Sequence, residues 1–304
     1  MAESDPRADS IEWTRPILLL AGPTASGKSR LALELARRRD AVILNADSQQ
    51  LYADLRVLTA RPSIEDEVLA EHRLYGVADA ADAWSVGRWL RAIEAELAAL
   101  TREGRPAIVV GGTGLYFRAL TEGLADIPAI PASDRDAASA LFDAKGEPDF
   151  RARLATLDAA SATRIAPGDR QRLIRAYSVA TTTGRTLGDW QAATRPAIGP
   201  ELHDAHLLEP DRVALYAACD RRAGQMLNEG AIEEVRRLLD RDLSPDLPAM
   251  KAVGVREIRG FLGDLTDRAA TLTALSQATR RYAKRQLTWF RNQTPNWLRV
   301  QALQ

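Results

Sequence analysis

Residues 17–36 read ILLLAGPTASGKSRLALELA, and this stretch decides the fold of the chain. Its four apolar residues, Ile17–Leu20, predict a buried strand, and the glycine-rich loop after them leads into a helix with an apolar face. The loop has the spacing G-x-x-x-x-G-K-[ST], formed by Gly22, Gly27, Lys28 and Ser29. Strand, loop and helix in this order are the context of a phosphate-binding loop, which argues against a chance glycine-rich turn.

Such a loop binds phosphate through its backbone and two side chains. Its glycines let the chain turn N–H groups inward onto an anion, and the N-terminus of the next helix adds partial positive charge. Lys28 is placed to hold a terminal phosphate, and the Ser29 hydroxyl is placed to hold Mg²⁺. The chain is therefore predicted to bind a diphosphate or polyphosphate, although the loop specifies neither the ligand nor the reaction.

Length and composition describe an ordinary globular protein. The 304 residues are 46% hydrophobic and 27% charged, and the formal net charge of +0 argues against a histone-like polyanion binder. Cys219 is the single cysteine, which excludes an intrachain disulfide and a cysteine-rich zinc site. No stretch has the length of a membrane span, and the N-terminus lacks the apolar core of a signal peptide. We expect a cytoplasmic protein.

Short apolar runs alternate with helical segments along much of the chain. The runs predict strands at Ile17–Leu20, Ala41–Asn45 and Ala107–Val110, with a weaker candidate at Ala205–Leu208. This alternation predicts an α/β fold, a P-loop NTPase-like parallel sheet with helices on both faces. Toward the C-terminus the pattern is helical, at Asp211–Leu239, Ala252–Leu262 and Asp267–Asn292.

Residues 123–199 differ from the rest of the chain. Five prolines break this stretch into short pieces, and no strand pattern occurs in it. The pieces are alanine-rich helices, at Ser133–Ala144, Asp149–Leu157 and Asp169–Thr183. We interpret the stretch as a helical insertion domain between two parts of the sheet domain, residues 13–122 and 200–304. An ordinary helical layer of a single domain is the alternative.

Polar and glycine-rich segments follow the second and third strands. Ligands in open α/β sheets bind beyond the carboxyl ends of the strands, so Asp47 and Thr113 are candidates for the site. A carboxylate at Asp47 suits Mg²⁺ or a substrate proton, and a helix N-cap is the structural alternative. Thr113, in Gly-Gly-Thr-Gly at 111–114, suits a second anion, and a tight turn that needs glycine is the alternative. The third strand lacks the terminal Asp of many ATP-hydrolysing proteins, which weakens a motor or GTPase interpretation.

Basic residues gather in three places. One group lies in the insertion, at Arg164, Arg170, Arg172 and Arg175. Another lies in the last helix among aromatic residues, at Arg280, Arg281, Lys284, Arg285 and Arg291, and Arg221 and Arg222 begin a third. One such group is usually a solvated face, but three of them with a phosphate loop make nucleic acid a candidate partner.

Five separated blocks resemble the bacterial tRNA dimethylallyltransferase (isopentenyltransferase) family. They are GPTASGKS at 22–29, NADSQQLY at 45–52, GGTGLYFRAL at 111–120, DRQRLIRA at 169–176 and AKRQLTWF at 283–290. The blocks occur in the family's order, and their combination is specific although many protein types share the phosphate loop. The chain departs from the family at Arg61, where lysine is usual, and near Ala138, where an RNA-contacting arginine is expected.

The resemblance implies a reaction and roles for matching residues. The N6 amine of the adenosine immediately 3′ of the anticodon, in tRNAs reading codons that begin with U, attacks C1 of dimethylallyl diphosphate, and diphosphate leaves. The implied catalytic residues are Asp47 as general base, Arg222 on the leaving group, and Thr113. The implied diphosphate site, with Mg²⁺ at Ser29, comprises Gly22, Pro23, Thr24, Ala25, Ser26, Gly27, Lys28 and Ser29. The implied contacts to the flipped adenosine and the anticodon stem-loop are Asp47, Ser48, Gln49, Gln50, Thr113, Gln171, Arg172, Arg175, Arg281, Lys284 and Arg285.

Three alternatives stay open on the sequence. One is a P-loop kinase of a small molecule or nucleoside, which would transfer phosphate from ATP without tRNA. Another is a non-catalytic RNA-binding protein with the same fold, and a third is an enzyme that prenylates free AMP or ADP, as plant-type cytokinin synthases do. The 77-residue insertion favours a macromolecular acceptor. We expect a monomer whose partners are tRNA and dimethylallyl diphosphate, with no membrane association.

Overall fold

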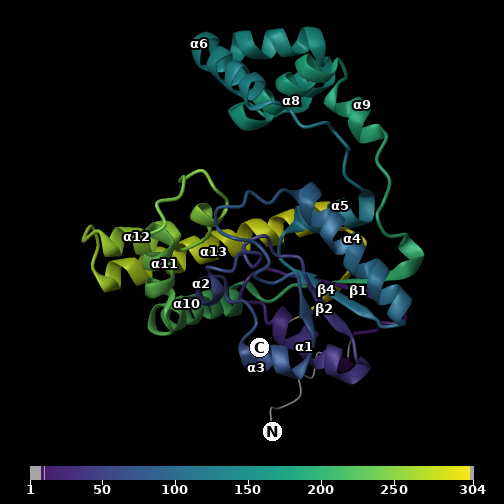
Figure 1. Ribbon diagram of the computed structural model, residues 1–304, viewed down its shortest axis with the longest axis vertical. Coiled ribbons are helices and arrows are strands. Elements are labelled where there is room, and N and C mark those ends of the chain that lie inside the picture. The colour runs from purple at the N-terminus through teal and green to yellow at the C-terminus, as the bar shows by residue number, and fades with distance from the viewer. Residues whose placement is uncertain (1–7, 10, 302–304) are drawn as a thin grey trace. The chain divides into compact units, whose positions relative to one another are not determined.

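The computed structural model describes residues 8–9 and 11–301 (Figure 1). The chain divides into two compact units. We call residues 1–121 with 198–304 the sheet unit, and residues 122–197 the helical unit. The sequence interpretation drew these boundaries at residues 123 and 199. Over the described residues, no helix combines the length and the apolar composition that crossing a bilayer requires.

Six parallel strands form the sheet, in the order β3-β2-β4-β1-β5-β6. Their bounds are β1 Ile17–Ala21, β2 Val42–Asn45, β3 His72–Arg73, β4 Ala107–Gly111, β5 His203–Leu208 and β6 Leu298–Val300. The predicted α/β fold is confirmed, and β1, β2, β4 and β5 match the four predicted strands. The sequence analysis missed β3 and β6 because strands of two and three residues carry no readable alternation or apolar run.

The centre of the sheet is apolar because helices cover both faces. Every residue of β1, β2 and β4 is buried, as expected for parallel strands that pack on two sides. On one face, Leu31 and Leu35 of α1 (Lys28–Arg39) belong to the same core cluster as Leu18 and Leu20. Burying one such leucine contributes roughly 1.5–3 kcal/mol. The phosphate loop therefore stands on a rigid base, between a buried strand and an anchored helix.

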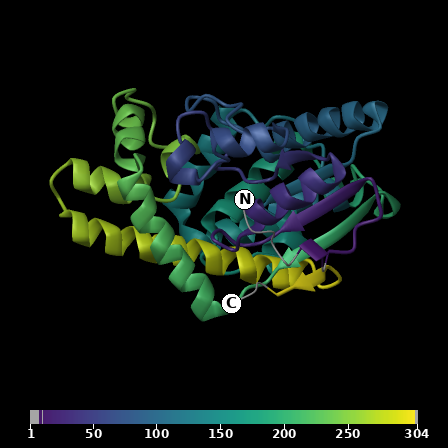
Figure 2. The same ribbon diagram turned by 90° about the horizontal axis from the view of Figure 1, so that it is seen from below.

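Four helices lie beyond the sheet and reach back to its carboxyl edge (Figure 1). They are α10 Arg212–Asn228, α11 Ala231–Leu239, α12 Val255–Leu262 and α13 Arg268–Gln293. The single helix predicted for Asp211–Leu239 is wrong, because the chain breaks at Gly230 with a φ of 115° that L-residues rarely adopt. Figure 2 shows α10 crossing α13, where Cys219 and Leu287 share one core cluster. This crossing fixes α13 next to the phosphate loop.

Further helices complete the sheet unit. They are α2 Arg56–Thr59, α3 Ile64–Leu69, α4 Val86–Glu103 and α5 Gly114–Glu122, with 3₁₀ helices at Pro200–Leu202 and Ala249–Lys251. The four-residue α2 has no side-chain cap of its own. The buried Glu234 of α11 supplies one instead, because its carboxylate accepts hydrogen bonds from Val57 N (2.8 Å) and Leu58 N (2.9 Å).

The helical unit has its own small core. Its helices are α6 Ala132–Leu157, α7 Ala159–Arg164, α8 Arg170–Thr183 and α9 Leu187–Ala192. Phe150 and Leu154 of α6 pack against Leu173 of α8, and all three side chains are fully buried. Gly146 breaks α6 with a φ of 74°, which accounts for the two helices that the sequence predicted there.

Candidate active site around the phosphate loop

The loops after β1, β2 and β4 converge at one edge of the sheet. These strands are neighbours in the sheet, so the segments that follow them lie together. The segments are residues 22–27, 46–50 and 112–113. Gly22 N donates to Gly111 O (3.2 Å), and Thr113 N donates to Ala46 O (3.2 Å). The three segments that the sequence assigned to a ligand site are therefore in direct contact.

The phosphate loop has the backbone shape of an anion cradle. Ala25 and Gly27 adopt left-handed conformations, with φ of 62° and 81°. Left-handed residues placed among right-handed ones turn successive N–H groups of a loop toward the same concave side. Because α1 begins at Lys28, its first-turn N–H groups, which lack acceptors within the helix, open onto the same place.

A wide cavity of about 640 Å³ opens over this loop. The loop and the start of α1 form one wall, and segments of α2, α3 and α10 form the others. The cationic side chains in its lining are Lys28, Arg30, Arg56, Arg61, Arg221 and Arg222. Asp66 and Glu229 are the carboxylates in that lining, and Asp66 caps α3 with Ser63. The excess of cations suits an anionic ligand.

Lys28 is buried under the loop and is poorly compensated there. Burial, the largest cause, lowers its pKa to about 8; Asp47 raises this pKa and Arg222 lowers it further. The ammonium group donates to Pro23 O over 3.2 Å. A bound diphosphate would supply the negative charge that this buried ammonium group needs.

Arg222 reaches the phosphate loop from α10. Its guanidinium donates to Thr24 Oγ1 over 3.1 Å. Burial lowers its pKa, whereas Asp47 acts in the opposite direction. Although 198 residues separate Thr24 from Arg222 in the sequence, Arg222 lies at the phosphate loop, where the family resemblance implied it would.

A second, narrow cavity of about 30 Å³ adjoins the first, and Arg222 and Met226 line both. Asp47 is in its wall and is only 6% exposed. One carboxylate oxygen accepts from Gln49 N (3.0 Å), which closes a turn two residues long. Asp47 therefore closes a local turn and does not cap a helix, and its side chain lines the narrow cavity.

Tyr282 lines this cavity, and Thr113 lies next to Tyr282. Thr113 Oγ1 accepts from Ser48 N (2.9 Å) and donates to Ser48 Oγ (3.2 Å). The Tyr282 phenol hydrogen-bonds to Gln49 and Thr113. Burial, aided by Asp47, raises the Tyr282 pKa far above its usual value, so the phenol stays neutral.

Gln286 of α13 joins two of the loops. Its amide oxygen accepts from Thr24 N (2.8 Å), and its amide nitrogen donates to Gly112 O (3.0 Å). A Cβ at Gly112 would lie 2.1 Å from that nitrogen, so glycine is required by close approach. The sequence analysis assigned no role to Tyr282 or Gln286. The available signal was their separation of four residues on one helix, with Gln286 inside the block at 283–290 and Tyr282 directly before it.

Side chains of the segment 47–50 either line the narrow cavity or support α2. Asp47 and Gln49 line the narrow cavity, and Gln49 Oε1 also accepts from Val253 N (3.0 Å). Gln50, which the resemblance assigned to RNA, is buried, and its amide donates to Thr59 O (2.9 Å) and to Ala60 O (2.8 Å). Its side chain therefore holds the end of α2 in place.

The basic residues assigned to RNA are exposed on two helices. In the sheet unit, Arg281, Lys284 and Arg285 of α13 line a hollow of about 520 Å³ that also includes Trp289. In the helical unit, Gln171, Arg172 and Arg175 are exposed on α8. Each helix thus presents a cationic surface of the kind that binds phosphate backbones.

The donor set at the loop fits Mg²⁺ only together with a ligand. In the parts of the chain that the structure describes, no three His, Cys, Asp or Glu side chains group so as to hold a metal. Ser29 lines the wide cavity, where its hydroxyl offers one oxygen. Because Mg²⁺ is usually held by one or two protein groups with phosphate oxygens and water, Ser29 fits an ion carried by a diphosphate.

Known proteins of one kind resemble the chain. A family model described as IPP transferase matches residues 50–293, and one described as isopentenyl transferase matches residues 15–82. The tRNA dimethylallyltransferase of Phenylobacterium zucineum is 57% identical, over 94% of this chain and 92% of that protein. The tRNA dimethylallyltransferase of Caulobacter sp. is 53% identical, over 94% and 93%.

Solved structures agree with this likeness. The full-length tRNA isopentenylpyrophosphate transferase of Bacillus halodurans superposes with a TM-score of 0.68 at 28% identity, covering 95% of this chain and 90% of that one. A eukaryotic dimethylallyltransferase acting on tRNA has the same fold, with a TM-score of 0.81 at 22% identity and coverage of 95% and 74%.

Proposed function

The chain belongs to the tRNA dimethylallyltransferase family, and from this premise we propose that it transfers a dimethylallyl group from dimethylallyl diphosphate to tRNA. The acceptor is N6 of the adenosine immediately 3′ of the anticodon, in tRNAs that read codons beginning with U. A P-loop kinase of a small molecule is not favoured, because the relatives are tRNA transferases.

One observation carries the proposal: the anion cradle and a buried carboxylate line two adjoining cavities that share Arg222 and Met226. Arg222, bonded to Thr24, lines both cavities, and Asp47 lines the narrow one. When the diphosphate group of the donor lies in the wide cavity, C1 of its dimethylallyl group would lie where the two cavities join, within reach of Asp47. Asp47 raises the pKa of both Lys28 and Arg222, as a carboxylate near a cation does.

The chemistry follows from these positions. The N6 lone pair of adenine forms a bond to C1 while the C1–O bond breaks, and that electron pair leaves on the diphosphate. Lys28, Arg222 and the N–H groups of the loop stabilise the negative charge that develops on the leaving oxygen. Asp47 takes the proton that N6 loses, as general base. Thr113 and the neutral Tyr282 phenol fix Ser48 and Gln49 beside this carboxylate.

Mg²⁺ supplies additional positive charge to the diphosphate when it is bound, and the Ser29 hydroxyl would hold it. The rest of the cradle is the backbone of residues 22–29. Every residue proposed for the chemistry comes from the sheet unit of one chain, which supports action as a monomer.

Two surfaces are proposed to bind the anticodon stem-loop. Arg281, Lys284 and Arg285 on α13 lie on the same helix as Tyr282, which lines the narrow cavity. Gln171, Arg172 and Arg175 on α8 are proposed to contact RNA from the helical unit. The target adenine must leave its stack to reach Asp47, because a base that stays stacked in the anticodon loop cannot enter the cavity that the buried carboxylate lines.

The test is a modification assay. Purified protein is incubated with Mg²⁺, dimethylallyl diphosphate and unmodified tRNA, and the digested tRNA is examined by mass spectrometry for N6-dimethylallyladenosine. The proposal requires this nucleoside, and it requires that a tRNA with guanosine at the target position stays unmodified. Phosphate transfer from ATP without tRNA would indicate the kinase instead. Prenylation of free AMP but not of tRNA would show that the acceptor is a free nucleotide.

A further inference from the structure

Asn45 is a polar residue in the core to which the family resemblance gave no role. It is the last residue of β2, two positions before Asp47, and its side chain is fully buried. A buried amide has no access to bulk water, so its N–H groups and its oxygen need partners within the protein. The partners of this amide therefore indicate what it does.

The Asn45 amide holds the main chain of Asp47 on both sides. Its Oδ1 accepts from Asp47 N (2.8 Å), and its Nδ2 donates to Asp47 O (3.0 Å). Two hydrogen bonds from one planar group fix the orientation of the residue that they grip. The bond from Gln49 N to the Asp47 carboxylate then fixes the side chain itself. Asn45 thus sets the direction from which the carboxylate enters the narrow cavity.

The same amide ties this turn to the segment after β3. Asn45 Nδ2 also donates to Leu74 O (3.0 Å). Leu74 is buried and has a φ of 66°, a left-handed conformation that leucine rarely adopts. Both N–H groups and the oxygen of the amide are therefore in use, and all three bonds go to the main chain around Asp47.

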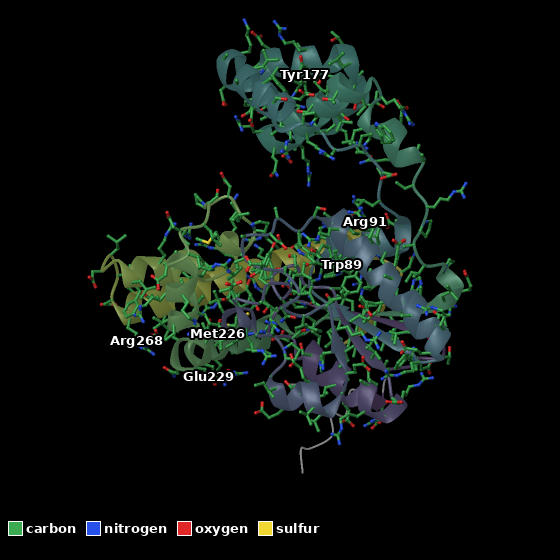
Figure 3. The ribbon with its side chains drawn as sticks, in the orientation of Figure 1. Trp89, Arg91, Tyr177, Met226, Glu229 and Arg268 are labelled. Atoms are coloured by element: carbon green, nitrogen blue, oxygen red, sulfur yellow. The ribbon has the colours of Figure 1, made fainter. Side chains whose placement is uncertain are left out.

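Asn45 is in turn held by α4. Trp89, which Figure 3 labels on that helix, donates from its indole Nε1 to Asn45 O (2.9 Å). The indole is fully buried and stacks on Tyr116 of α5, with 4.1 Å between the ring centroids. A chain of hydrogen bonds thus runs from Trp89 through Asn45 to Asp47.

The residue between Asn45 and Asp47 is held independently by β4 and the segment after it. Ala46 N donates to Val110 O (2.8 Å), and Ala46 O accepts from Thr113 N (3.2 Å). A Cβ on Gly111 would lie 2.1 Å from Ala46 O, so the two backbones are in close contact. Loss of the Asn45 amide should therefore release Asp47 without displacing β2.

We propose that Asn45 is a positioning residue for the general base. This inference rests on the proposed function, in which Asp47 removes the proton from N6. Asn45 is absent from the described linings of both cavities, so it acts through Asp47 and not on the donor or the tRNA. It keeps the carboxylate where proton removal needs it, because a misplacement of about 1 Å costs on the order of 100-fold in rate.

A double-mutant cycle on the rate of transfer tests this role. Single-turnover transfer from dimethylallyl diphosphate to unmodified tRNA is measured at saturating substrates for the wild type, Asn45→Ala, Asp47→Asn and the double variant. Asn45→Ala is expected to lower the rate about 10- to 100-fold, with unchanged affinities for donor and tRNA. In the Asp47→Asn background, where no base remains to be positioned, it should change the rate by no more than about twofold.

Two further variants separate positioning from a general loss of structure. Trp89→Phe keeps a ring over Tyr116 but removes the N–H that bonds to Asn45 O, so it should lower the rate about two- to tenfold, again only while Asp47 is present. This variant carries the test if Asn45→Ala does not fold. Leu97→Ala, in the core of α4 outside this hydrogen-bonded chain, is the control and should unfold at a lower temperature with an unchanged rate.

The outcomes distinguish this inference from the proposed function. If the wild type modifies tRNA but the variants lower the rate by equal factors with and without Asp47, or leave it unchanged, the positioning role is overturned and the function stands. A loss of rate in Leu97→Ala as large as that in Asn45→Ala would also overturn it. Absence of transfer by the wild type overturns both.

Discussion

The free protein should become more stable when Lys28 is replaced by methionine. Lys28 is buried, and its pKa is lowered from 10.5 to about 8, mainly by that burial. At roughly 1.4 kcal/mol per pKa unit, keeping the side chain charged at pH 7 costs the folded state about 3 kcal/mol. Methionine retains most of the volume without the charge. The variant loses the hydrogen bond to Pro23 O, which reduces the expected gain in stability by about 1 kcal/mol.

The expected stabilisation depends on pH in a defined direction. Between pH 8 and 10.5 the folded wild-type protein has released the Lys28 proton, whereas the unfolded chain still holds it. Stability of the wild type therefore rises with pH through this window, and that of Lys28→Met does not. The difference should be about 2 kcal/mol in favour of the variant at pH 7, and close to zero at pH 9.5.

Urea denaturation without ligands at both pH values measures this difference. Inorganic diphosphate with Mg²⁺ should then stabilise the wild-type protein more than Lys28→Met, because only the wild type keeps the ammonium group for the anion. A variant that is less stable than the wild type at pH 7, or a difference that does not shrink with pH, would refute the reasoning that the loop buries an uncompensated charge.

Three further variants test other parts of the site. Arg222→Gln should raise KM for the donor and lower kcat, together by about 100-fold in kcat/KM, because its charge acts on the leaving group; unchanged steady-state kinetics would remove it from the site. Glu234→Gln should lower the free energy of unfolding by about 1–3 kcal/mol, since its carboxylate caps two N–H groups of α2; denaturation curves identical to the wild type would contradict this. Replacing Arg281 and Lys284 by alanine should reduce the slope of log affinity against log salt by about 1.5–2 in tRNA titrations, and an unaltered slope would place the RNA elsewhere.

The sequence predicted the parts of the structure that depend on local pattern. The phosphate loop needed only its own spacing, and Asp47 and Thr113 needed only their position after buried parallel strands. Because neighbouring parallel strands end at the same edge, local predictions translated directly into proximity. Arg222 required the family resemblance, since nothing local connects α10 with a loop 198 residues away.

The remaining features depend on tertiary packing that local patterns do not encode. Tyr282 and Gln286 reach the site only because α10 and α13 cross there, and a helix pattern does not specify its partner. Gln50 resembled a ligand contact from its place in the motif, yet its amide holds the end of α2. Glu234 gave no signal, because a buried carboxylate that caps a distant helix has the same sequence pattern as an exposed one.

The central claim is that Asp47 removes a proton from an adenine held against C1 of a diphosphate donor. Single-turnover transfer to unmodified tRNA, with the wild type and Asp47→Asn at saturating donor and tRNA, tests it most directly. The asparagine keeps the oxygen that accepts from Gln49 N, so the local turn should persist. We expect Asp47→Asn to transfer the group at least ~100-fold more slowly, with unchanged affinities for tRNA and for the diphosphate donor. Equal single-turnover rates for the two proteins would contradict it.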